Sequence, residues 1–443
     1  MNDVQINTPN IEKMKNLTII LFLLYFISAC TPPLPAPTMD GIAEKYVKLI
    51  LEIGQYNGDF VDAYYGPDEW KPTSKADSIP AKKFISRAID LISLCDQVDT
   101  KSFTDLDHAR LIMMKKQLLA AKTKVEMING TTYSFDEEAK LLYDTEPPHY
   151  ESAYFDSLLL NMDNQVPGTG DLSSRYNAYV EQFMIPKDKL DTVFKTAIEE
   201  ARLRTKRYYD LPENENFVLE YVTGKSWGGY NYYQGNSQSL IQINTDFPIS
   251  ISRAIDLACH EGYPGHHIFN AMLEQNLVNG KGWKEFSVYP LFSPLSLLAE
   301  GSANYGIDVA FPGDERVKYE KEVLFPLAGL DASKADEYYA IQKLFSKLTY
   351  ARTEADRKYL DGEITSEDYV DWVVKYNLYA PDKALHSIKF ADQYRSYVIN
   401  YNWGMDLVAA YIESRGGTAD QPEKRWAIFK ELISTPNTAS SLK

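Results

Sequence analysis

Three of the six histidines lie close together, in the segment HEGYPGHH that runs from His260 to His267. A carboxylate, Glu261, directly follows the first of them. Neutral imidazoles are common zinc ligands, and a carboxylate beside them can deprotonate a water molecule on the metal. These residue types in this pattern predict a hydrolytic zinc site with Glu261 as its general base.

The spacing differs from the H-E-x-x-H pattern, in which two histidines at i and i+4 share one face of a helix. Position i+4 is Pro264, which removes a helical hydrogen bond and clashes with the preceding turn, and Gly265 lets the backbone bend again. A helix opened there could bring His266 back toward His260. In an unbroken helix His267 would lie about 10 Å from His260, too far for two zinc bonds of about 2.0–2.1 Å. We therefore expect His266 to be the second ligand, with His267 as the alternative.

A third protein ligand is expected from residues 296–311, which have the apolar pattern of a buried helix. Glu300 lies in this run directly after three apolar residues, where a carboxylate is costly to bury unless a cation compensates it. Asn304 and Asp308 follow on the same helix face. Like Asp256, one turn before the histidines, they are suited to hydrogen bonds with imidazole N–H groups.

Most of the remaining chain has helical periodicity, and strand signals are few. The expected helices are residues 39–56, 104–128, 187–209, 331–360, 365–378 and 383–400. Short strands are expected at 217–223 and 239–244, on either side of a Gly-rich stretch at 224–235. The pattern predicts a mainly α protein with a small β-sheet, divided into two lobes near the loop 210–216.

The N-terminal sequence predicts a lipid anchor. Residues 14–30 read MKNLTIILFLLYFISAC, with Lys15 before an apolar run that is too short to span a bilayer. The ending in Ile-Ser-Ala-Cys is typical of a bacterial lipoprotein signal peptide, which makes Met14 the expected start and Cys30 the lipid-bearing residue. The alternative is a buried strand that ends at a core cysteine.

Together with the loop at 210–216, the N-terminal sequence divides the chain into four expected parts. The expected parts are a signal peptide at 1–29, a Pro-rich tether at 30–40, a helical N-terminal lobe at 41–212 and a catalytic lobe at 213–443. We expect a bacterial envelope protein that is held to a membrane through lipid and faces the periplasm or the exterior.

The composition excludes several classes of protein. The chain has 443 residues, of which 62 are acidic and 46 basic, so its net charge is −16. Nucleic acid is a poor partner for so acidic a chain, because phosphate binding needs clustered Lys and Arg. Three cysteines are too few for a disulfide scaffold or a cysteine-type zinc site. Nothing in the sequence indicates an oligomeric state.

The block HEGYPGHH, followed by EGSANY at 300–305, resembles the bacterial HExxPGHH family. That family is a domain of unknown function grouped with zincin-like metallopeptidases of the gluzincin type, and many of its members have lipoprotein sequences. The resemblance covers about residues 220–310. It implies a zincin-like fold around a cleft and a Zn²⁺ site of His260, His266 and Glu300, with Glu261 as catalytic base.

A peptidase also needs a donor for the oxyanion of its tetrahedral intermediate, and often a cation for a substrate carboxylate. Tyr397, Tyr401, Arg395 and His386 are the candidates, at roughly helical spacing; the alternative is that they are core tyrosines and a surface arginine. The expected function is a lipid-anchored zinc peptidase that acts on peptides. The alternative is a non-catalytic envelope lipoprotein that binds peptides or cell-wall fragments in the same cleft.

Overall fold

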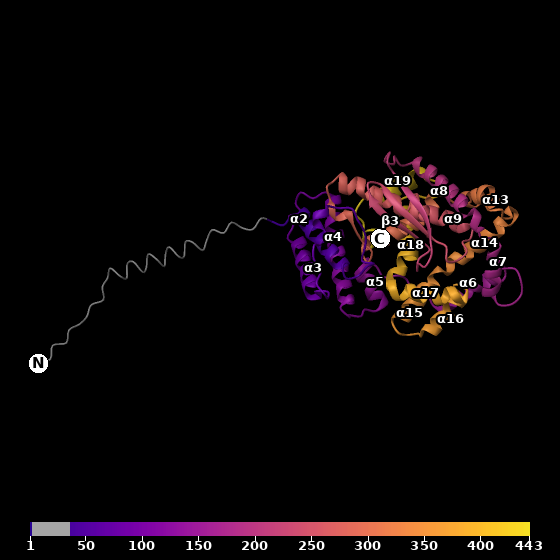
Figure 1. Ribbon diagram of the computed structural model, residues 1–443, viewed down its shortest axis with the longest axis horizontal. Coiled ribbons are helices and arrows are strands. Elements are labelled where there is room, and N and C mark those ends of the chain that lie inside the picture. Colours follow the sequence, from indigo (N-terminus) through magenta and orange to yellow (C-terminus); the bar gives the residue numbers. More distant parts are fainter. Residues whose placement is uncertain (2–35) are drawn as a thin grey trace. The chain divides into compact units, whose positions relative to one another are not determined.

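The computed structural model describes Met1 and residues 36–443. The expected signal peptide after Met1, including Met14, lies outside the described residues, as do Cys30 and the first part of the tether. Thr38–Lys443 forms one compact unit (Figure 1). A continuous core joins residues from both sides of the boundary expected at 210–216, so the structure does not support two separate lobes.

The first half of this unit is helical, apart from one short strand, β1 (Val61–Tyr64). Its helices are α2 (Met39–Gly54), α3 (Ala81–Asp96), α4 (Asp105–Ile128), α5 (Phe135–Tyr143), α6 (Ser152–Asp163), α7 (Leu172–Glu181) and α8 (Leu190–Lys206). In Figure 1 α2, α3 and α4 lie together at one end of the unit. The apolar periodicity predicts α2, α4 and α8 to within a few residues, because apolar side chains of each helix pack into the core.

A three-stranded sheet follows α8, in the order β2-β4-β3. Its strands are β2 (Asn216–Val222), β3 (Gly229–Gly235) and β4 (Gln238–Asn244). β2 is parallel to β4, whereas β3 pairs with β4 antiparallel. The β3–β4 turn places Asn236 and Ser237 at φ of 54° and 56°, the left-handed pair that a tight hairpin requires. The small sheet expected from the sequence is therefore present, with β3 as an additional edge strand inside the Gly-rich stretch.

The second half is again mainly helical, with a short strand, β5 (Val288–Pro290), that pairs antiparallel with β1. Its helices are α9 (Ser252–Leu257), α10 (His266–Leu273), α11 (Pro294–Ala310), α12 (Glu315–Tyr319), α13 (Phe325–Ala328), α14 (Ala335–Phe345), α15 (Thr349–Leu360), α16 (Ser366–Tyr376), α17 (Pro381–Tyr394), α18 (Ile399–Ser414) and α19 (Pro422–Ile433). The mainly α class expected from the sequence is confirmed.

Two of the expected long helices are interrupted. Residues 331–360 divide into α14 and α15, with a 3₁₀ turn at Ser346–Leu348 between them. Residues 383–400 break at Arg395, whose φ of 53° is left-handed and cannot continue a right-handed helix. A 3₁₀ turn at Arg395–Val398 follows the break, and α18 begins at Ile399.

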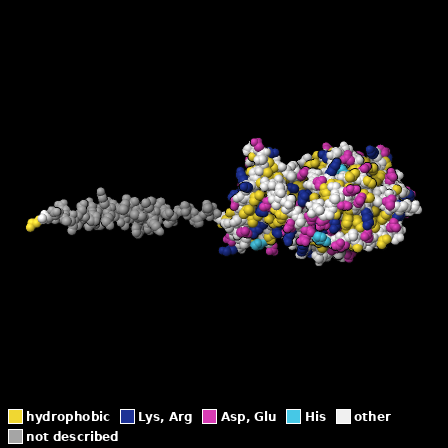
Figure 2. Space-filling model, turned by 90° about the horizontal axis from the view of Figure 1, so that it is seen from below, with side chains coloured by type: hydrophobic (Ala, Val, Ile, Leu, Met, Phe, Trp, Pro, Cys, Tyr) yellow, Lys and Arg dark blue, Asp and Glu magenta, His cyan; other side chains and the backbone are white. Residues whose placement is uncertain are grey.

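The surface of the unit carries both signs of charge. On the face shown in Figure 2, acidic and basic side chains are interspersed with apolar ones. Among the residues that the structure describes, no helix has both the length and the apolar composition needed to cross a membrane.

Candidate metal centre

The histidine segment spans a break between α9 and α10. α9 continues into a π-helical segment, Ala258–Gly262, before the chain turns back and α10 begins. The backbone N–H of Gly265 donates a hydrogen bond of 2.9 Å to the carbonyl of Cys259. A Cβ at Gly265 would lie 2.0 Å from the carbonyl oxygen of His260. The chain can therefore return this closely only through glycine, and the return places His266 beside His260.

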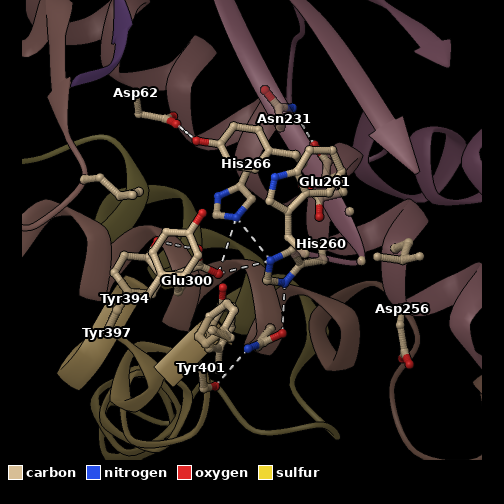
Figure 3. A pocket seen from close by; sticks show the side chains of 18 of the residues that line it. Asp62, Asn231, Asp256, His260, Glu261, His266, Glu300, Tyr394, Tyr397 and Tyr401 are labelled. Carbon is tan, nitrogen blue, oxygen red and sulfur yellow. Dashed lines mark hydrogen bonds and ion pairs between the residues drawn. The ribbon is translucent and has the colours of Figure 1, made fainter. Parts of the chain in front are cut away.

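Three side chains converge at this bend (Figure 3). Nε2 of His260 lies 3.1 Å from Nε2 of His266 and 3.1 Å from Oε2 of Glu300. Nε2 of His266 lies 3.5 Å from the same oxygen. Donor atoms that bind one tetrahedral zinc at about 2.0–2.1 Å are about 3.3 Å apart. The three atoms therefore have the spacing and the chemistry of a zinc ligand set.

Each of two ligand candidates is oriented by a further hydrogen bond. The amide nitrogen of Asn304 donates to the carbonyl of Tyr401 at 2.8 Å, which leaves Oδ1 to accept from Nδ1 of His260 at 2.9 Å. Nε2 of His260 then has its lone pair directed into the centre. The hydroxyl of Tyr397 donates to Oε1 of Glu300 at 2.7 Å, while Oε2 is buried and makes no hydrogen bond with any described group. A metal ion would satisfy that orphaned oxygen.

The two other residues expected to support the imidazoles have different roles. Asp256 forms an ion pair of 2.8 Å with Arg316. The backbone carbonyl of Asp308 accepts a hydrogen bond from Arg425. Neither side chain contacts an imidazole within the part of the chain that the structure describes.

A close helix crossing holds Glu300 against Tyr397. A Cβ at Gly301 of α11 would lie 2.5 Å from the carbonyl carbon of Gly404 in α18. A Cβ at Gly404 would in turn lie 2.9 Å from the carbonyl oxygen of Leu297. The two backbones can approach this closely only because both positions lack a side chain, and the approach brings the start of α18 to the candidate metal centre.

Glu261 lies beside His260, His266 and Glu300, and its carboxylate is uncommitted in the sense that no described residue pairs with it. It is 3% exposed, and its carboxylate makes no hydrogen bond or ion pair with the described residues. Its backbone carbonyl accepts a hydrogen bond of 2.7 Å from Asn231 of β3. Burial raises the pKa of Glu261 to about 7; His260 lowers it and Glu300 raises it further. A pKa near the ambient pH is what a general base needs.

Glu300 is affected in the opposite direction. Burial opposes its ionisation, but His266 and His260 beside it hold the pKa of its carboxyl well below the usual range. The carboxylate form, which is the one that binds a metal, is therefore favoured where the imidazoles are close.

His267, the alternative second ligand, points into a separate buried network. Its Nε2 lies 2.9 Å from Glu215, and its Nδ1 lies 2.8 Å from Oγ of Ser239. Tyr263 and Arg202 also donate to Glu215. His267 is completely buried, and its two contacts tie α10 to Glu215 and to Ser239 of β4.

The candidates from residues 386–404 lie in different places. Tyr397 and Tyr401 line the cavity that also includes His260, His266 and Glu300, and the Tyr401 ring is 6.4 Å from the ring of His260. Burial, Glu300 and Glu261 raise the pKa of Tyr401, so its hydroxyl keeps its proton and can donate.

Arg395 and His386 are not among the residues that line the cavity. Nε of Arg395 donates to Glu138 at 2.6 Å, and the ring of His386 lies 5.9 Å from the ring of Phe247. His386 lies on α17, and Arg395 lies at the left-handed turn that ends this helix, so neither side chain takes the place beside the centre that was expected from the sequence.

The cavity has a volume of about 400 Å³ and includes groups that the sequence did not single out. Among these are Asp62 of β1, Arg352 of α15 and Gly229 of β3. Asp62 and Arg352 are far from the motif in sequence, and no local spacing indicates them. The paired glycines 228–229 could have indicated this part of the site from the sequence, because glycine in a strand often marks a close approach of another group. A Cβ at Gly229 would lie 2.6 Å from Oε1 of Glu261.

No family model matches the chain, and no curated protein matches its sequence. Among solved structures, it is similar to the putative lipoprotein from Colwellia psychrerythraea, with a TM-score of 0.48 and 16% identity over 81% of this chain and 67% of that one. It is also similar to a putative lipoprotein of unknown function from Shewanella oneidensis, with a TM-score of 0.41 and 12% identity over 80% and 72% of the two chains. Neither similarity is close enough to indicate what this chain does, so its function is argued from its site.

Proposed function

We propose that this chain is a zinc-dependent peptidase of the zincin-like type. The observation that carries the proposal is the convergence of His260, His266 and Glu300 at 3.1–3.5 Å, beside the uncommitted carboxylate of Glu261. A cavity of about 400 Å³ adjoins these groups and lies within the range of about 300–1,000 Å³ that small ligands occupy.

His260, His266 and Glu300 would hold the metal. Zinc in such a site supplies a Lewis acid for a carbonyl oxygen and lowers the pKa of a water molecule. Glu261 takes a proton from the attacking water as the water oxygen bonds to the carbonyl carbon of the peptide. The C–N bond then breaks, and Glu261 passes the proton to the leaving amine. The hydroxyl of Tyr401 is the donor we assign to the oxyanion, because that of Tyr397 already donates to Glu300.

The proposed location of the protein is the surface of a membrane. The signal-like sequence at 14–30 supports a lipid anchor on Cys30, and the Pro-rich run after it would hold the folded unit away from the membrane. A Cys30→Ser protein should then lose palmitate labelling and leave the membrane fraction. Continued retention in the membrane at high salt would contradict the anchor.

The test of the activity is Glu261→Gln, which removes the base but keeps the size of the side chain. We expect zinc content to stay at the wild-type level and hydrolysis of a mixed peptide library to fall by at least about a hundredfold. Glu220→Gln, an exposed change on β2, is the matched control and should leave both unchanged. Unchanged turnover in Glu261→Gln would refute the assigned base. A zinc-loaded wild-type protein with no turnover would favour the non-catalytic lipoprotein that binds peptides or cell-wall fragments.

A further inference from the structure

Most charged side chains that line the cavity already have a charged partner. Arg253 lies 3.4 Å from Asp256, Arg352 lies 3.7 Å from Asp356, and Glu300 faces two imidazoles. Asp256 also pairs with Arg316, outside the cavity.

Two of the carboxylates that line the cavity, Glu261 and Asp62, have no Lys, Arg or His within 4.0 Å among the described residues. The proposed mechanism uses Glu261 as its base. Asp62 is therefore an acidic group in the cavity that has neither a charged partner nor an assigned task.

Asp62 is built into the wall of the cavity. It lies on β1, which pairs with β5 just before α11, the helix that carries Glu300. The hydroxyl of Tyr230, on the edge strand β3, donates a hydrogen bond to Oδ1 of Asp62 (Figure 3). This contact fixes one carboxylate oxygen, whereas Oδ2 accepts no hydrogen bond from the described residues.

The surroundings of Asp62 favour the arrival of a cation. Asp62 is partly buried. A carboxylate that loses part of its hydration without a counter-charge is costly, and a cation bound beside it offsets that cost. Burial, with smaller contributions from Glu300 and Glu261, raises the pKa of Asp62 to about 8. A positively charged ligand group beside Oδ2 would favour the ionised form of this carboxyl and would be bound by a charge-assisted hydrogen bond.

We propose that Asp62 binds an ammonium group of the peptide substrate, and this inference rests on the proposed peptidase function. The ammonium group belongs either to the N-terminus of the peptide or to a lysine side chain. In both cases Asp62 determines specificity: it selects positively charged peptides and positions them.

The experiment measures peptide binding to zinc-loaded Glu261→Gln protein by calorimetry, so that it does not depend on turnover. Each lysine-containing peptide is compared with its N-acetylated form and with a form that has norleucine in place of lysine. We expect one of these two changes to weaken binding by about tenfold to a hundredfold, the usual range for a hydrogen bond between charged groups. Acetylation identifies the N-terminus as the source, and norleucine identifies the side chain.

Asp62→Asn, added to the same protein, should lower the affinity for the ammonium-bearing peptide by the same factor and leave the affinity for its uncharged form unchanged. Asparagine can still accept the hydrogen bond from Tyr230, and unchanged zinc content and melting temperature would verify the fold. Asp62→Glu should restore part of the discrimination, and Asp59→Asn, a neighbouring change outside the cavity, should have no effect. Equal affinity for charged and uncharged peptides would overturn the inference, and so would an equal loss of both in Asp62→Asn. Absence of turnover in the wild type would overturn only the peptidase function.

Discussion

The hydroxyl of Tyr397 donates a hydrogen bond of 2.7 Å to Oε1 of Glu300, and this contact gives the two oxygens of one carboxylate different surroundings. Oε2 faces the imidazoles of His260 and His266 at 3.1 Å and 3.5 Å. The hydroxyl therefore fixes the rotation of the carboxylate that completes the ligand set. We assign Tyr397 as a positioning residue.

Tyr397→Phe should weaken zinc binding without unfolding the protein, because it removes the hydrogen bond but keeps the ring. Loss of such an outer partner typically costs about 10–100-fold in metal affinity. Competition with a chelator of known affinity measures the change. Tyr394→Phe is the control, since Tyr394 also lines the cavity but makes no hydrogen bond to Glu300. Equal affinities for Tyr397→Phe and wild type would show that Glu300 needs no such support.

His266→Ala should lose most of the bound zinc, whereas His267→Ala should keep most of it. The reason is that Nε2 of His266 lies 3.1 Å from Nε2 of His260, while His267 contacts Glu215 and Ser239 in a separate network. His267→Ala should instead lower the melting temperature, because it leaves the buried Glu215 with fewer partners. Metal analysis of both purified proteins decides the matter. An occupied His266→Ala protein beside an empty His267→Ala protein would reverse the assignment.

Gly229→Ala should reduce turnover more than zinc content. The added Cβ would lie 2.6 Å from Oε1 of Glu261, so the carboxylate must move from its position beside the metal centre. Gly228→Ala is a closely matched control, because its Cβ would come no closer than 4.0 Å to Arg253. The comparison is made on peptide hydrolysis and metal content together. If both variants were as active as wild type, the position of Glu261 would not control the reaction.

Lys124→Met should stabilise the protein at neutral pH. Lys124 is 6% exposed, its Nζ lies 3.4 Å from the centre of the Phe292 ring, and burial lowers its pKa from 10.5 to about 8. The unfolded state thus holds the proton more tightly, so the free energy of unfolding of the wild type rises with pH between about 8 and 10.5. Below that window Lys124 is protonated in both states, and the full cost of burying its charge lowers the stability of the folded protein. At about 1.4 kcal/mol per unit of pKa, the gain at pH 7 is at most about 3.5 kcal/mol.

Urea denaturation of Lys124→Met at pH 7 and above pH 10.5 checks this linkage. The gain should be large at pH 7 and small at the higher pH, where the folded and unfolded wild-type chains are both neutral at this position. Lys115→Met, a more exposed change on the same helix, should show no such difference. A gain of equal size at both pH values would mean that the added packing of methionine, and not the charge, is responsible.

The sequence predicts the helices well where apolar residues recur over several turns, on one face of α2 and around nearly all of α11. It also predicts that His260 and His266 come together at the candidate metal centre, because they are close in sequence and the Pro264–Gly265 pair indicates the bend between them. Glu300 could be identified because a carboxylate in an apolar helix requires compensation. These inferences depend on local spacing and on the cost of burying charge.

Features that depend on distant parts of the chain were not predictable in this way. Asp62 reaches the cavity only because β1 pairs with β5, which lies over two hundred residues further along the sequence. Arg395 instead donates to Glu138 of α5, far earlier in the chain, and the left-handed φ of 53° at its own position ends α17 there. Arg352 lines the cavity from α15 without any motif around it.

Anomalous diffraction on either side of the zinc absorption edge is the most direct test of the metal centre, with crystals of protein purified without chelator. The account predicts one peak at bonding distance, about 2.0–2.2 Å, from Nε2 of His260, Nε2 of His266 and a carboxylate oxygen of Glu300. Asp136, Glu146 and His149 form a second, more exposed group of metal-type side chains. The absence of a peak between His260, His266 and Glu300, or a peak confined to that second group, would contradict the account.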